Sequence, residues 1–170
     1  MLNAIDKLFS DIDYFAECAS KVQIEKYSDI IRSKCIYSRD TERGAFFCAI
    51  PKSCCDSPEK AVPILFIYSL YDAQEWPKTE ESWSEDFTIK DWKRYLKTIW
   101  IPDCFSCKGA SRIPYTQSDI IKGPTLKDEL LKIAVLSPVL SIIRCGTIDE
   151  GYFFTYVIET EDEYIFFETW

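Results

Sequence analysis

Apolar residues near the N-terminus recur at three- and four-residue spacing, which is the period of a helix with one buried face. This pattern predicts an amphipathic helix from about Leu2 to Ser20. A weaker pattern of the same period predicts a second helix over residues 24–34, which ends before the polar stretch Ser38–Gly44. That stretch is typical of a turn.

Two apolar segments follow. Ala45–Ile50 is short and bounded by Gly44 and Pro51, and Val62–Tyr71 is rich in β-branched and aromatic residues. Both features favour strands. The segment between them, Pro51–Pro58, is expected to be a loop, and so is the acidic, tryptophan-bearing segment that begins at Asp72 and ends at Phe87.

Two predicted helices begin with the same sequence pattern. In Thr88–Asp91 and in Thr125–Asp128, a threonine is followed three residues later by an aspartate. This is the arrangement of a capping box, in which each side chain binds a backbone N–H at the start of the helix. The two helices are expected to end at Pro102 and before Pro138.

Alternating and aromatic residues fill the C-terminal part of the chain. They predict strands at Val139–Cys145, Tyr152–Ile158 and Tyr164–Thr169, with the last two joined by Glu159–Glu163 as a hairpin. The length of 170 residues suits one domain, residues 1–170. The expected fold class is therefore α+β, with N-terminal helices packed on a mostly antiparallel β-sheet and a C-terminal hairpin.

Charge is unevenly distributed along the chain. The formal net charge is −8, and two segments carry most of the excess: Asp72–Asp86 has a net charge of −5, and Cys145–Trp170 has −7 without any basic residue. Such segments repel nucleic-acid phosphates and anionic lipid headgroups, and they attract basic partners in a salt-dependent way. We therefore expect a basic protein partner, no nucleic acid and no membrane.

Histidine is absent from the sequence, and the five glycines are too isolated to form a phosphate-binding loop. The commonest general base and the commonest metal-binding ring are thereby removed. We expect no enzymatic activity, no catalytic residue and no cofactor.

Eight cysteines accompany an N-terminus that lacks the pattern of a secretory signal, so we expect reduced thiols in the cytoplasm. The longest mostly apolar runs, about eleven residues each, are too short to span a bilayer. Cys104 and Cys107 form the one C-x-x-C motif. A thiol- or zinc-dependent enzyme built on this pair stays open as an alternative, although no metal site is predicted.

Acidic and large aromatic residues are interleaved in both acidic segments. Aromatic side chains supply contact area at an interface, and neighbouring acids steer a basic partner. The residues predicted to bind a partner are Trp76, Glu80, Glu81, Trp83, Glu85, Asp86, Glu161, Asp162, Glu163, Glu168 and Trp170.

These features resemble those of the immunity proteins of bacterial polymorphic toxins, including the contact-dependent inhibition and type VI types. The resemblance rests on Asp72–Phe87, on the segment Trp92–Trp100 and on the aromatic, acidic C-terminal hairpin. It implies a cytoplasmic protein that binds and neutralises a cognate toxin, often a nuclease with a basic active site. The alternative is an adaptor or regulatory domain that binds a different protein partner.

Overall fold

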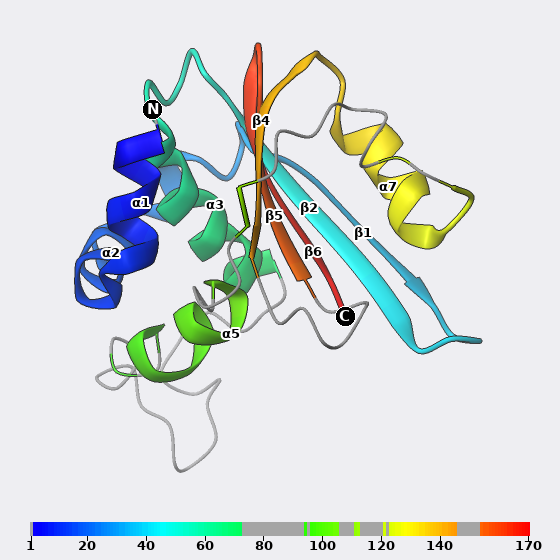
Figure 1. Ribbon diagram of the computed structural model, residues 1–170, viewed down its shortest axis with the longest axis horizontal. Coiled ribbons are helices and arrows are strands. Elements are labelled where there is room, and N and C mark those ends of the chain that lie inside the picture. The colour runs from blue at the N-terminus through cyan, green and yellow to red at the C-terminus, as the bar shows by residue number, and fades with distance from the viewer. Residues whose placement is uncertain are drawn as a thin grey trace.

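The computed structural model shows one sheet with helices on both of its faces (Figure 1). It describes residues 2–72, 94, 96–105, 111–112, 121, 123–145 and 154–170. The six strands lie in the order β1-β2-β6-β5-β4-β3, and every neighbouring pair is antiparallel. Their bounds are β1 Arg32–Ser38, β2 Arg43–Pro51, β3 Ser111–Arg112, β4 Val139–Cys145, β5 Phe154–Thr160 and β6 Glu163–Thr169. The predicted α+β class is confirmed.

The helices divide between the two faces. On one face lie α1, α2, α3 and α5, and on the other lies α7 (Figure 1). The helical segments are α1 Leu2–Ser10, α2 Ile12–Ser20, the 3-10 turn η1 Ile24–Lys26, α3 Pro58–Asp72, the π-helical turn η3 Leu96–Trp100, α5 Ile101–Phe105 and α7 Leu126–Ala134. Among the described residues the longest helix is α3, with 15 residues, and none is long and apolar enough to cross a bilayer.

Each face of the sheet has its own core. Successive side chains of a strand point to opposite faces. Phe46, Cys48 and Ile50 of β2 accordingly join a first core with α1, α2 and α3, whereas Phe47 joins a second core with α7. Aromatic rings dominate the first core, and Phe15 and Phe105 lie 4.9 Å apart between centroids. A sheet buried on both faces explains why β5 and β6 are apolar on both sides.

The predicted N-terminal helix exists, but it is broken. Asp11 lies between α1 and α2 in an extended conformation, and its carboxylate accepts a hydrogen bond from the Tyr14 backbone N–H at 2.9 Å. This is an N-cap, which starts a new helix. Apolar spacing alone did not reveal the break, because Leu8 and Phe15, on either side of it, both point into the first core.

Two predictions were wrong. Residues 24–34 form a 3-10 turn followed by the start of β1, because pairing of β1 with β2 overrides the weak helical period. Val62–Tyr71, predicted as a strand, lies in helix α3. All residues from 61 to 70 are buried, so this helix has no polar face to reveal its period.

Most of the other described elements agree with the sequence, and one predicted helix end does not. The predicted strands at 45–50, 139–145 and 164–169 are confirmed, and β5 overlaps the strand predicted at 152–158. Thr125 and Asp128 form the predicted capping box at the start of α7. The start expected at Thr88 lies outside the described residues, but helical structure continues through Pro102 to Phe105, beyond the predicted end.

Candidate functional site

The residues predicted to bind a partner fall into two groups. Five of them lie on the β5–β6 hairpin: Glu161, Asp162, Glu163, Glu168 and Trp170. The other six belong to the segment before Phe87 and lie outside the described residues: Trp76, Glu80, Glu81, Trp83, Glu85 and Asp86. The hairpin therefore provides the geometry of the candidate site.

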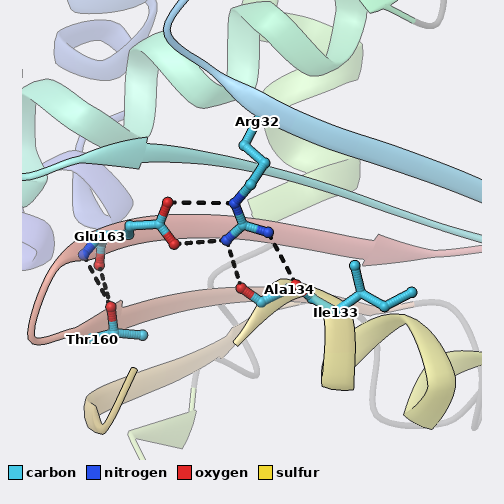
Figure 2. Close-up of polar contacts among 5 residues, drawn as sticks. All are labelled: Arg32, Ile133, Ala134, Thr160 and Glu163. Carbon is cyan, nitrogen blue, oxygen red and sulfur yellow. Dashed lines mark hydrogen bonds and ion pairs between the residues drawn. The ribbon is translucent and has the colours of Figure 1, made fainter. Parts of the chain in front are cut away.

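Glu163 is bound within the fold by Arg32. The Arg32 guanidinium donates to both oxygens of the carboxylate, at 2.6 Å from Nη2 and 3.5 Å from Nε (Figure 2). It also donates to the carbonyls of Ile133 and Ala134 at the end of α7, at 3.0 and 2.8 Å. A cation at a helix C-terminus satisfies carbonyls that lack an intrahelical partner. Arg32 thus joins β1, the hairpin and α7.

Glu159 is also neutralised within the fold. Its side chain is buried, and one carboxylate oxygen lies 2.7 Å from the Lys52 ammonium while the other accepts a hydrogen bond from Ser141 at 3.3 Å. The same ammonium lies 5.2 Å from the centre of the Tyr164 ring. Burial, and then the charge of Glu159, raise the pKa of Tyr164. The Glu159 carboxylate therefore stabilises the fold and is not exposed to a partner.

Hydrogen bonds to backbone groups fix the conformation of the turn between β5 and β6. Thr160 accepts a hydrogen bond from the Glu163 N–H at 3.0 Å and donates to its carbonyl at 3.1 Å (Figure 2). Outside the hairpin, the Glu161 N–H donates to the Pro138 carbonyl at 3.0 Å, and the Lys52 N–H donates to the Asp162 carbonyl at 2.8 Å. The side chains of Glu161 and Asp162 remain exposed on this fixed backbone.

Exposed apolar residues lie beside this turn. Leu136, between α7 and β4, is 68% exposed, and Leu140, the second residue of β4, is 55% exposed. Thr160 pairs with Val139 and Glu159 pairs with Ser141, so Leu140 is the extra residue of a β-bulge. A bulge redirects a side chain out of the regular alternation. Leu136, Pro138, Leu140, Glu161 and Asp162 together form what we call the turn face.

The remaining two hairpin candidates lie far from the turn face. Glu168 and Trp170 are half-buried near the opposite end of β6, and the indole of Trp170 packs against the first core. At about 3.3 Å per residue, Asp162 and Trp170 are roughly 25 Å apart along the strand. The structure therefore does not bring them into one compact site.

Sequence reasoning did not identify four residues that shape this site: Arg32, Lys52, Leu136 and Leu140. The two basic residues come from segments 131 and 107 positions away from their acidic partners. No local pattern reports such pairs. The sequence did contain a sign of the two leucines. They lie on either side of Ser137 and Pro138, which interrupt an apolar run.

The described residues do not support a thiol- or zinc-dependent enzyme that uses Cys104 and Cys107. Cys104 is half-buried against the first core, and Cys107 lies outside the described part of the chain. Within that part, no group of three or more Cys, Asp or Glu side chains is placed to hold a metal ion.

The sequence matches no family model, and neither curated proteins nor solved structures gave a match.

Proposed function

We propose that this chain is an immunity-type binding protein, which neutralises a basic cognate toxin by covering it with the turn face. One observation carries the proposal. Of the four acids between residues 159 and 163, Glu159 and Glu163 are bound by Lys52 and Arg32, whereas Glu161 and Asp162 are exposed beside two exposed leucines.

An interface needs apolar contact area at its centre and complementary charge at its rim. Leu136 and Leu140 supply the first, and Glu161 and Asp162 supply the second. The hydrogen bonds of the turn backbone to Pro138 and Lys52 hold both parts in place before a partner arrives. Such pre-organisation lowers the entropy lost on binding.

The overall charge favours the same kind of partner. A net charge of −8 accelerates encounter with a basic protein, and this acceleration falls as salt screens the field. The partner that fits best is therefore a basic toxin domain. A nuclease is one such domain, because its active site must attract phosphate.

The test begins with the genes on either side of this one. A toxin domain encoded there is purified, and its rate of association with this protein is measured by biolayer interferometry over a range of salt concentrations. The double variant Glu161→Lys, Asp162→Lys is expected to associate about tenfold more slowly and to show a flatter salt dependence. The matched control is Asp40→Lys, Glu42→Lys. It makes the same change of charge in the exposed turn between β1 and β2, at the other end of the sheet.

Equal rates for the two double variants would rule out the turn face as the contact. No binding to the neighbouring toxin, together with specific co-purification of another protein from the native host, would favour the adaptor alternative. That alternative uses the same face and differs only in its partner.

A further inference from the structure

A cleft of about 800 Å³ lies on the side of the sheet that carries α2 and α3 (Figure 1), and none of its lining residues belongs to the turn face. One wall consists of residues from α2 and η1, between Tyr14 and Tyr27. The other consists of the loop after β2 and the first turns of α3, between Ser53 and Ile64. Its volume is in the range of small-molecule sites, roughly 300–1,000 Å³.

The cleft has an apolar and aromatic lining between its polar groups. Val22, Tyr27, Pro63 and Ile64 contribute carbon surface from both walls. Tyr14 also lines the cleft, and its hydroxyl donates a hydrogen bond to the Glu59 carboxylate. The lining therefore suits a flat organic group, and the Glu59 carboxylate is already hydrogen-bonded by a residue of the cleft.

Basic residues outnumber acidic residues around this cleft, which reverses the balance of the whole chain. The ammonium groups belong to Lys21 and Lys26 on one wall and to Lys60 on the other, against the carboxylates of Asp56 and Glu59. Positive groups on facing walls favour a negatively charged ligand.

Two of these ammonium groups form ion pairs with exposed carboxylates. Lys21 lies 2.9 Å from Glu17, and Lys60 lies 2.8 Å from Asp56, each at a spacing of four residues. Exposed pairs of this kind contribute little stability, so their lysines can turn toward a bound anion at small cost. Lys26 is exposed and forms no ion pair with any other described residue.

We propose that this cleft binds a small organic anion with a flat apolar body, with the body between the two walls and the acid group near Lys26 and Lys60. The residues that line this cleft differ from those of the turn face, and its proposed ligand does not depend on the immunity function. An aromatic sulfonate or carboxylate has the required chemistry.

The probe is 1-anilinonaphthalene-8-sulfonate, whose fluorescence rises in an apolar environment. We expect saturable binding at one site per chain that weakens with added salt. The uncharged analogue N-phenyl-1-naphthylamine has the same rings and should bind at least fivefold more weakly. Lys26→Gln and Lys60→Gln should each weaken sulfonate binding about three- to tenfold.

Three further variants locate the site. Lys132→Gln removes a lysine from a comparable exposed pair on α7, with Glu129, and should leave the affinity unchanged. Val22→Trp should block the cleft, whereas Leu136→Ser with Leu140→Ser should have no effect on the probe. Near-ultraviolet circular dichroism confirms that each variant is folded.

Three results would overturn the proposal. They are equal affinity for the charged and uncharged probes, unchanged affinity in Lys26→Gln and Lys60→Gln, and loss of binding in the leucine double variant. The last result would place the probe on the turn face.

Discussion

Gly44 lies directly against the indole of Trp170. A Cβ atom at Gly44 would be 2.3 Å from two carbons of that ring. The two residues also exchange backbone hydrogen bonds, from the Gly44 N–H to the Trp170 carbonyl at 2.8 Å and from the Trp170 N–H to the Gly44 carbonyl at 3.1 Å. The absence of a side chain at position 44 therefore allows the ring to cover the start of β2.

Gly44→Ala is expected to lower the free energy of unfolding by about 1–3 kcal/mol, because the ring must move from its place against the first core. Urea denaturation measures this change. Combining it with Trp170→Ala tests the cause. If the clash is responsible, adding Gly44→Ala to Trp170→Ala should cost less than adding it to the wild type.

Arg32→Ala should lower stability by roughly 3 kcal/mol, because it leaves the half-buried Glu163 carboxylate and two α7 carbonyls without their donor. Glu163→Gln keeps the shape of the side chain and should cost less. Thermal unfolding of both variants and their combination gives the coupling energy. Equal losses for the two single variants, fully additive in the double variant, would contradict a shared interaction.

Leu136→Ser with Leu140→Ser should speed dissociation of the toxin complex at least tenfold and leave the association rate nearly unchanged. The reason is that apolar contacts form after the charge-steered encounter. Tyr37→Ser is the control, since Tyr37 is 54% exposed but lies on β1. The measurement is the dissociation rate of each variant by the same interferometry. A slower association rate would assign the leucines to the encounter instead.

Stability should fall at alkaline pH because of Tyr164. Burial and the nearby Glu159 charge raise its pKa above the ordinary value of 10.0, so the folded state holds the phenolic proton longer than the unfolded state. The stability contribution is complete below about pH 10 and is lost as the pH rises toward the folded pKa. Urea denaturation between pH 9 and 11 should show this loss, and Tyr164→Phe should reduce its slope. An unchanged slope would contradict the assignment.

Ser137→Ala should leave the protein equally stable or up to about 1 kcal/mol more stable. The Ser137 hydroxyl is buried and has no hydrogen-bond partner among the described residues. Removing it eliminates a desolvated polar group next to Leu136 on the turn face. The measurement is the midpoint of thermal unfolding, and a lower midpoint would indicate that the hydroxyl is satisfied by water in solution.

Local patterns were sufficient for part of the fold. The strand at β4 and the cap at Thr125 depend on neighbouring residues, and both were predicted at the right positions. Helix α3 was not recognised, because a helix buried on all sides loses the polar positions that mark its period. Strand β1 was missed for a different reason, since its pairing with β2 decides its conformation.

The candidate site shows the same division. The acidity of the hairpin was evident from the sequence, but the separation of structural from exposed acids was not. Glu159 and Glu163 look like Glu161 and Asp162 in the sequence, and only the positions of Lys52 and Arg32 distinguish them. Charge counted over a local window thus overestimates the charge that a partner meets.

The order of strands also has a consequence for folding kinetics. β2 and β6 are neighbours in the sheet although they come from opposite halves of the sequence. The hairpins β1–β2 and β5–β6 join segments close in sequence and can form early, whereas docking one on the other must close a long loop. We therefore expect the β2–β6 pairing, and with it the Arg32–Glu163 contact, to form in the rate-limiting step.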